Sequence, residues 1–168
     1  MGVQIYDLGD LTQLSEGQIA QRIIKRSKSA KKYESTHLYR GLAATPEIMR
    51  RIKKYGTDRH LLNSEEKAQR AAIEMERIET LTGRLRNTNS LSIEIATNPN
   101  KIWAAEEKEL TEVIKKYAIG IGAKSPDTTP IILAYRREAL DAVGGLYLYE
   151  FKKSVKPIDA LVAGFCFK

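Results

Sequence analysis

The hydrophobic residues of this chain change their spacing about two thirds of the way along it. In the first part they recur every three or four residues, which is the period of a helix with one apolar side. In the last part they form short alternating or continuous runs bounded by glycine and proline, which are typical of strands. This pattern predicts an α+β fold in which a mixed or antiparallel sheet is assembled late in the chain.

The predicted helices begin at Ser15, Thr45-Pro46, Asn63 and Asn98-Pro99. Ser15 and Gln18 have the three-residue spacing of a capping box. Thr45-Pro46-Glu47 combines a capping hydroxyl, a proline at the first helical position and an acid at the positive end of the helix dipole. The helices that begin at Thr45 and Asn63 are expected to end at Gly56 and Gly83, because glycine readily adopts the left-handed conformation that closes a helix.

The predicted strands cover residues 35–40, 90–97, 130–135, 146–151 and 161–167. Ile102 and Trp103, in contrast, are expected on the inner side of the helix that begins at Asn98-Pro99. The interpretation is a single domain over residues 34–168, preceded by a basic helical extension over residues 1–33.

The composition is that of one globular domain, with 168 residues of which 42% are hydrophobic and 29% charged. A single cysteine, Cys166, excludes an internal disulfide and a cysteine-based zinc site. The two histidines, His37 and His60, provide little material for a metal site. No apolar run reaches the length of a bilayer span and the first residues do not resemble a secretory signal, so no membrane partner is expected. The expected location is the cytoplasm, or the exterior if the chain is secreted as an effector without a recognisable leader.

Positive charge is concentrated in one segment of the chain, whose total net charge is +7. Residues 22–60 hold twelve Lys or Arg and three Asp or Glu, a net charge of +9, so the other 129 residues carry −2. Such a segment attracts an anionic partner, which is a phosphate-bearing ligand, a nucleic acid or an acidic protein face. Helix surfaces that are rich in lysine and exposed to water have the same composition without any ligand.

Four polar residues on or beside predicted strands are candidates for a site: Arg40, Ser92, Thr97 and Glu150. An arginine offers a fork of donors that matches phosphate oxygens, and a hydroxyl can hold a sugar in place. A carboxylate can accept from ribose hydroxyls and stabilise the positive charge that develops when a glycosidic bond breaks. Each residue also has an ordinary explanation: Arg40 in a salt bridge, Ser92 as an alternating polar residue and Glu150 on the solvent side of an edge strand.

Three motifs occur in a fixed order. The first is Leu38-Tyr39-Arg40-Gly41-Leu42, which leads through the Thr-Pro-Glu helix to Lys54-Tyr55-Gly56. The second is the strand at residues 90–99, followed by Trp103-Ala104-Ala105, and the third is Tyr149-Glu150-Phe151. Together they resemble the mono-ADP-ribosyltransferases of the arginine–serine–glutamate class over roughly residues 34–168. The resemblance implies an ADP-ribosyltransferase-like fold, with mixed or antiparallel sheets in a single domain.

The resemblance also implies an enzyme of the bacterial effector or toxin kind, which transfers ADP-ribose from NAD to a macromolecular acceptor. Arg40 would bind the NAD phosphates or the adenosine ribose beside Gly41, and Ser92 or Thr97 would orient the nicotinamide pocket. Glu150 would hold the nicotinamide ribose 2′-hydroxyl and favour the oxocarbenium-like transition state. Two tyrosines, Tyr147 and Tyr149, are expected on one side of their strand, packing in the core or stacking on nicotinamide.

Two features depart from the family pattern. The Ser-Thr-Ser motif is not intact, and Leu148 stands where arginine-modifying members carry Glu or Gln. An acceptor other than arginine and a chain that has lost activity are both open. Two alternatives without catalysis are a nucleic-acid-binding domain that uses residues 22–60 and a protein-interaction domain that keeps the fold.

Overall fold

The structure is a computed structural model that describes residues 3–9, 14–30, 36–58, 65, 68–69, 72, 100–120, 127–143 and 147–167. The predicted strand at residues 90–97, with Ser92 and Thr97, lies outside the described residues. The predicted helix that begins at Asn63 lies largely outside them as well, and its four described residues are helical.

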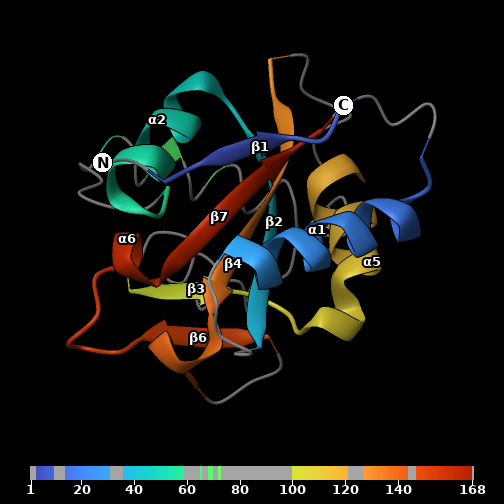
Figure 1. Ribbon diagram of the computed structural model, residues 1–168. Helices are drawn as coiled ribbons and strands as arrows, with labels where there is room; N and C mark the ends of the chain where they lie inside the picture. The colour runs from blue at the N-terminus through green and yellow to red at the C-terminus, as the bar shows by residue number, and fades with distance from the viewer. Residues whose placement is uncertain are drawn as a thin grey trace.

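Two β-sheets organise the described part of the chain (Figure 1). The four-stranded sheet has the order β1 (Ile5–Asp7), β7 (Leu161–Cys166), β4 (Thr129–Arg136) and β2 (His37–Ala44). The three-stranded sheet has the order β3 (Lys101–Trp103), β6 (Leu148–Phe151) and β5 (Leu140–Ala142). Strands β1 and β7 are parallel, and the other described pairs are antiparallel. The predicted α+β class, with mixed and antiparallel sheets, is therefore confirmed.

The two longest described helices are α1 (Glu16–Ala30) and α2 (Pro46–Tyr55). A further helical segment begins with the short turn η2 (Glu107–Glu109), continues as α5 (Leu110–Val113) and ends in the π-helical turns η3 (Ile114–Gly120). Two short turns, η4 (Arg137–Ala139) and α6 (Pro157–Ala160), connect the late strands.

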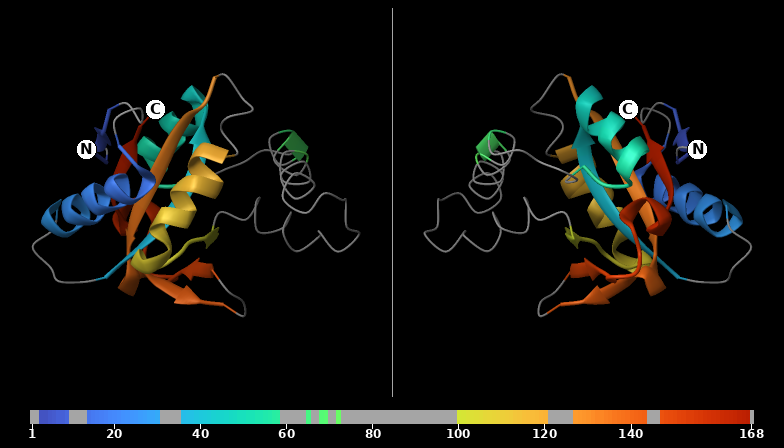
Figure 2. Two further views of the ribbon diagram at one scale, coloured as in Figure 1. Left: turned by 90° about the vertical axis from the view of Figure 1, so that its right-hand side faces the viewer. Right: turned by 90° about the vertical axis from the view of Figure 1, so that its left-hand side faces the viewer.

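The four-stranded sheet buries both of its faces. One face packs against α1, α5 and η3, and its core includes Ile23, Tyr39 and Phe165. The other face packs against α2, α6 and the three-stranded sheet, whose strands β3 and β6 run crosswise to β2 and β4 (Figures 1 and 2). Successive residues of a strand point to opposite faces, so β4 supplies apolar side chains to both cores. For this reason its sequence is a nearly continuous hydrophobic run.

The predicted helix caps of α1 and α2 are confirmed. The Ser15 backbone N–H donates to Gln18 Oε1 over 2.9 Å, and the Gln18 N–H donates to Ser15 Oγ over 3.2 Å. Thr45 Oγ1 accepts from the N–H of Ile48 at the start of α2. Gly56 closes that helix with a φ of +82°, in the left-handed region that glycine adopts without strain.

Residues 1–33, predicted as an extension, contribute to the same core as the rest of the chain. Strand β1 pairs with β7 inside the four-stranded sheet, and α1 places Ile19 and Ile23 in the core beneath that sheet. Strand β1 was not predicted, because three residues are too few to show a clear alternation.

The helix predicted to begin at Asn98-Pro99 is wrong in its first part. Lys101, Ile102 and Trp103 form β3 and pair with Glu150, Tyr149 and Leu148 of β6. Helical structure begins only at Glu107. Three residues are too few to distinguish the helical period from the alternation of a strand. Pairing with β6 makes this segment a strand.

Within the described ranges, no helix is long and apolar enough to span a bilayer. The same residues contain no group of three His, Cys, Asp or Glu side chains that could hold a metal ion.

Candidate functional site

Glu150 lies on β6, the central strand of the three-stranded sheet, and is half-buried. Its neighbours Tyr149 and Phe151 point into the core between the two sheets, so alternation directs Glu150 to the outer face. The carboxylate forms no hydrogen bond or ion pair with any described residue. Partly buried polar groups usually have partners in a folded protein, which makes this carboxylate a candidate for binding a ligand.

Three side chains share that outer face with Glu150. Lys101 of β3 and Asp141 of β5 are directly opposite Glu150 in the two neighbouring strands. Trp103 stands two residues from Lys101 on the same side of β3, and its buried indole N–H has no hydrogen-bond acceptor in the described part of the chain. The outer face of the three-stranded sheet thus holds two carboxylates, an ammonium group and an indole N–H with no acceptor among the described residues, and we call it the Glu150 face.

Arg40 occupies a different environment. It lies on β2, only 8% exposed, and its Nη1 and Nη2 donate to Asp58 Oδ1 and Oδ2 over 2.8 Å and 3.4 Å. Asp58 is 2% exposed and lies in the turn that follows Gly56 at the end of α2. The Tyr135 hydroxyl donates to the Gly56 carbonyl in the same turn over 2.6 Å. Arg40 therefore joins β2 to the end of α2 in a forked, buried ion pair.

The structure does not bring Arg40 and Glu150 together. The side chain of Arg40 is on the same side of β2 as Leu38, which belongs to the core between the sheets, whereas Glu150 points away from that core. The two strands connect through Tyr39, whose backbone bonds to Ala105 two residues after β3. Lys101, opposite Glu150, is four residues from Ala105, or roughly 13 Å at about 3.3 Å per extended residue. The two side chains therefore face different sides of the structure, and Arg40 is already paired with Asp58.

Three other predicted cofactor contacts, Gly41, Tyr147 and Tyr149, lie within the described residues. A Cβ on Gly41 would meet Val113 Cγ1 at 2.8 Å and the Val113 carbonyl at 3.0 Å, so glycine is needed there for α5 to pack on β2. Tyr149 is 9% exposed in the core between the sheets, with the Arg137 guanidinium 5.4 Å from its ring centroid. Tyr147 precedes β6 with a φ of +66° and is 46% exposed, so it does not pack in the core, and its stacking on nicotinamide stays a prediction.

Sequence reasoning did not select Lys101, Trp103, Asp141 or Asp58 for a site. Lys101 is about fifty residues from Glu150 in the sequence and Asp141 about ten. Only strand pairing makes them neighbours of Glu150. No local pattern reports such pairing. One local signal could have pointed to Asp58. A helix C-terminus favours cations, so an acid just after Gly56-Thr57 is unfavourable there unless a cation pairs with it.

Comparison with protein-family models, with curated proteins and with solved structures finds no match to this chain.

Proposed function

We propose that the protein is an NAD-dependent mono-ADP-ribosyltransferase in which Glu150 is the catalytic carboxylate. The observation that supports this best is the half-buried Glu150 on the central strand of the three-stranded sheet, where its carboxylate has no partner among the described residues. The order of the Tyr-Arg-Gly strand β2, the Thr-Pro-Glu helix α2 and the glutamate strand β6 supports it as well.

The chemistry asked of Glu150 is the stabilisation of positive charge. The bond between the nicotinamide nitrogen and C1′ of the ribose breaks, and nicotinamide leaves with the bonding electron pair. The carboxylate accepts a hydrogen bond from the ribose 2′-hydroxyl and stabilises the oxocarbenium-like charge at C1′. A nucleophile of the macromolecular acceptor then forms the new bond to C1′ and loses its proton.

The neighbours of Glu150 supply the rest of the face in this proposal. Lys101 is opposite Glu150 and adds a cation that suits the phosphates of NAD. The Trp103 indole N–H lies on the same face, is buried and has no acceptor among the described residues. Arg40, which forms a buried pair with Asp58, serves the fold in this proposal and does not contact the reacting ribose.

The test is the release of nicotinamide from NAD by the purified full chain, measured by chromatography. Glu150→Gln keeps the shape of the side chain and removes its charge, so turnover is expected to fall by about 10²-fold or more. Glu112→Gln is the matched control, since Glu112 is an exposed acid of α5 that pairs with Lys116 over 3.6 Å. Its turnover is expected to match the parent protein.

Circular dichroism of both variants separates a loss of chemistry from a loss of fold. Equal turnover in Glu150→Gln and the parent protein would remove Glu150 from the mechanism. A parent protein that neither releases nicotinamide nor gains thermal stability with NAD would overturn the proposal as a whole.

A further inference from the structure

Helix α1 has one side in the core and the other side exposed to water. Ile19 and Ile23 pack in the core beneath the four-stranded sheet, and the buried Ser27 lies on the same side of the helix. Figure 2 shows α1 at one edge of the molecule in both views, with strands of the sheet on its inner side. Packing of the inner side therefore fixes the direction in which the outer side of α1 faces.

The outer side of α1 carries amides and cations. Four exposed residues follow one another there at a spacing of three, one and three residues: Gln18, Gln21, Arg22 and Lys25. The exposed Lys28 follows three residues later, and we call these five residues the α1 face. The only acid of α1 is Glu16, which is half-buried and lies two residues before Gln18, so it is on a different side of the helix. The α1 face therefore has three cations and no anion.

The cations of the α1 face have few competing partners. Arg22 and Lys25 form no hydrogen bond or ion pair with any described residue. Lys28 Nζ lies 3.5 Å from Glu107 Oε1, but the two side chains are 57% and 38% exposed, so water screens this pair and it contributes little. Arg26 is not counted in the face, because its guanidinium lies 4.9 Å from the centroid of the Tyr6 ring.

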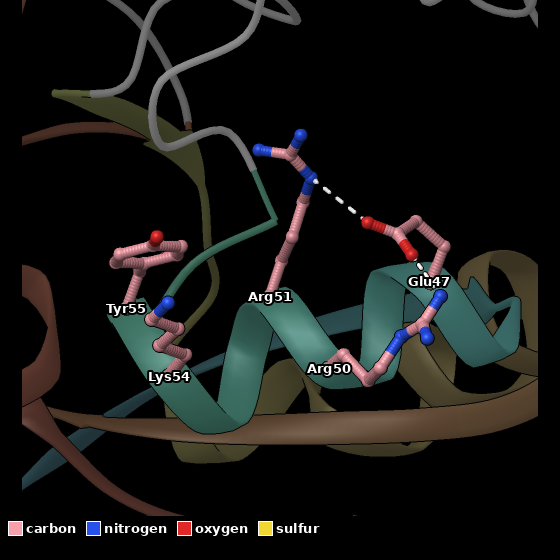
Figure 3. A pocket seen from close by; sticks show the side chains of 5 residues that line it. All are labelled: Glu47, Arg50, Arg51, Lys54 and Tyr55. Atoms are coloured by element: carbon pink, nitrogen blue, oxygen red, sulfur yellow. Dashed lines mark hydrogen bonds and ion pairs between the residues drawn. The ribbon is translucent and has the colours of Figure 1, made fainter.

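Helix α2 belongs to the same basic segment of the chain but contains an acid among its cations. Glu47 accepts a hydrogen bond from Arg50 Nη2, and its Oε1 lies 3.7 Å from Arg51 Nε (Figure 3). The carboxylate neutralises part of the charge of α2 and occupies donors of both arginines. An anionic partner is therefore expected at α1 in preference to α2.

The residue types of the α1 face favour one class of polyanion. Cations alone attract any acidic surface, whether protein or nucleic acid. Side-chain amides and guanidinium groups, in addition, match the donors and acceptors that base pairs present in the major groove of DNA. That groove is about 12 Å wide and admits an α-helix, whose diameter with side chains is about 10–12 Å. The major groove of duplex RNA is too deep and narrow for the same contact.

We propose that the α1 face binds double-stranded DNA in its major groove. Gln18, Gln21 and Arg22, in the first half of the helix, contact base edges. Lys25 and Lys28, in the second half, contact phosphates. The proposal does not depend on transferase activity, because the α1 face and the Glu150 face have no residue in common.

The test is a fluorescence-anisotropy titration of a labelled DNA duplex of random sequence with the full chain, at low and at physiological salt. Lys25→Ala is expected to weaken binding about tenfold at physiological salt, and to lower the slope of log affinity against log salt by about 1. Lys25→Arg keeps the charge and is expected to bind as the parent protein does.

Arg50→Ala is the matched control. Arg50 is 74% exposed on α2, which packs on the other face of the four-stranded sheet, so the variant removes one positive charge away from the α1 face. Its affinity is expected to stay within about twofold of that of the parent protein. Glu150→Gln is expected to bind DNA as the parent protein does.

Sequences enriched from a random duplex library by the parent protein and by Gln21→Ala test the base contacts. Gln21→Ala is expected to lose preference at one base pair and to keep the salt slope of the parent protein, because an amide neutralises no phosphate. Circular dichroism of each variant checks that the fold is kept.

Three results would each overturn the proposal. The first is no binding of duplex DNA at low salt. The second is competition by polyglutamate or by duplex RNA as strong as that by duplex DNA, which would identify an acidic protein or a sequence-independent contact instead. The third is an equal loss of affinity in Arg50→Ala and Lys25→Ala, which would show that overall charge controls binding.

Discussion

Arg40 shows how a residue selected for ligand chemistry can serve the interior of the fold. Both partners of its ion pair are nearly buried, with side chains 9% and 3% exposed for Arg40 and Asp58. The fork of the guanidinium matches the two carboxylate oxygens, which is the geometry that makes such a pair tolerable away from water.

Removal of one partner from this pair is expected to be costly. Asp58→Ala takes the carboxylate away from the buried Arg40 guanidinium, and Arg40→Ala takes the guanidinium away from the buried Asp58 carboxylate, so each should lower the free energy of unfolding by about 3–5 kcal/mol. Urea denaturation followed by circular dichroism measures this. The double variant Arg40→Met/Asp58→Leu is expected to be more stable than either alanine variant, because it buries no charge. Alanine variants as stable as the parent protein would contradict the role of the pair.

Tyr39 makes stability depend on alkaline pH. Burial raises its pKa above the ordinary value of 10.0, and the nearby Ser27 hydroxyl offsets this only in part. The Tyr39 hydroxyl has no hydrogen bond of ordinary geometry to any described residue, and Ser27 donates instead to the Ile23 carbonyl over 2.7 Å. The folded state therefore favours the neutral phenol, and this contribution is complete below pH 10 and is lost as the pH rises through the higher pKa of the folded state.

Tyr39→Phe tests this dependence. At pH 8 the variant is expected to be within about 1 kcal/mol of the parent protein, because the lost hydroxyl had no partner. Above pH 10 it should lose less stability than the parent protein does, and urea unfolding at the two pH values gives the comparison. Parallel losses in both proteins would show that another group controls alkaline unfolding.

At the scale of elements, α2 is defined by its two ends. Thr45 caps the first turn, and Gly56 ends the last one with a positive φ and a close approach to the backbone of Ile158. A Cβ at residue 56 would overlap that backbone, and it would also force a non-glycine residue into the left-handed region.

The two ends should therefore differ in their sensitivity to alanine. Thr45→Ala removes one capping hydrogen bond and is expected to cost about 1 kcal/mol. Gly56→Ala is expected to cost more than about 2 kcal/mol, since strain adds to the steric overlap. Thermal unfolding of the two variants ranks them, and the opposite ranking would mean that the turn after α2 relaxes without cost.

At the scale of the whole molecule, the N-terminal segment completes the fold. β1 covers the edge of β7, and α1 lies beside α5 on one face of the four-stranded sheet (Figures 1 and 2). Both elements come from the part of the chain that composition alone marks as a basic appendage.

Deletion of residues 1–33 is thus expected to abolish cooperative folding. The truncated chain would expose the edge of β7 and the apolar surface that Ile19 and Ile23 cover, which favours aggregation. Size-exclusion chromatography and a thermal melt measure the outcome. A monomer that melts cooperatively near the temperature of the full chain would show that the segment is dispensable.

Local patterns sufficed wherever a structure depends on residues close in sequence. The capping box at Ser15, the cap at Thr45, the stop at Gly56 and the continuous apolar strand β4 all follow from short-range geometry. The same patterns predicted the α+β class, because their order along the chain limits which layers can pack.

Only the tertiary structure decided which distant residues meet. It paired Arg40 with Asp58 across the end of α2, set Lys101 opposite Glu150, and made residues 101–103 a strand instead of a helix. The reason is that strand pairing and buried ion pairs draw their free energy from partners far along the chain, whereas helix caps and hydrophobic periods are satisfied within a few residues. The sequence by itself determined the helix caps, the apolar strand β4 and the charges that α2 carries, and packing determined which short segments became strands and which distant side chains meet.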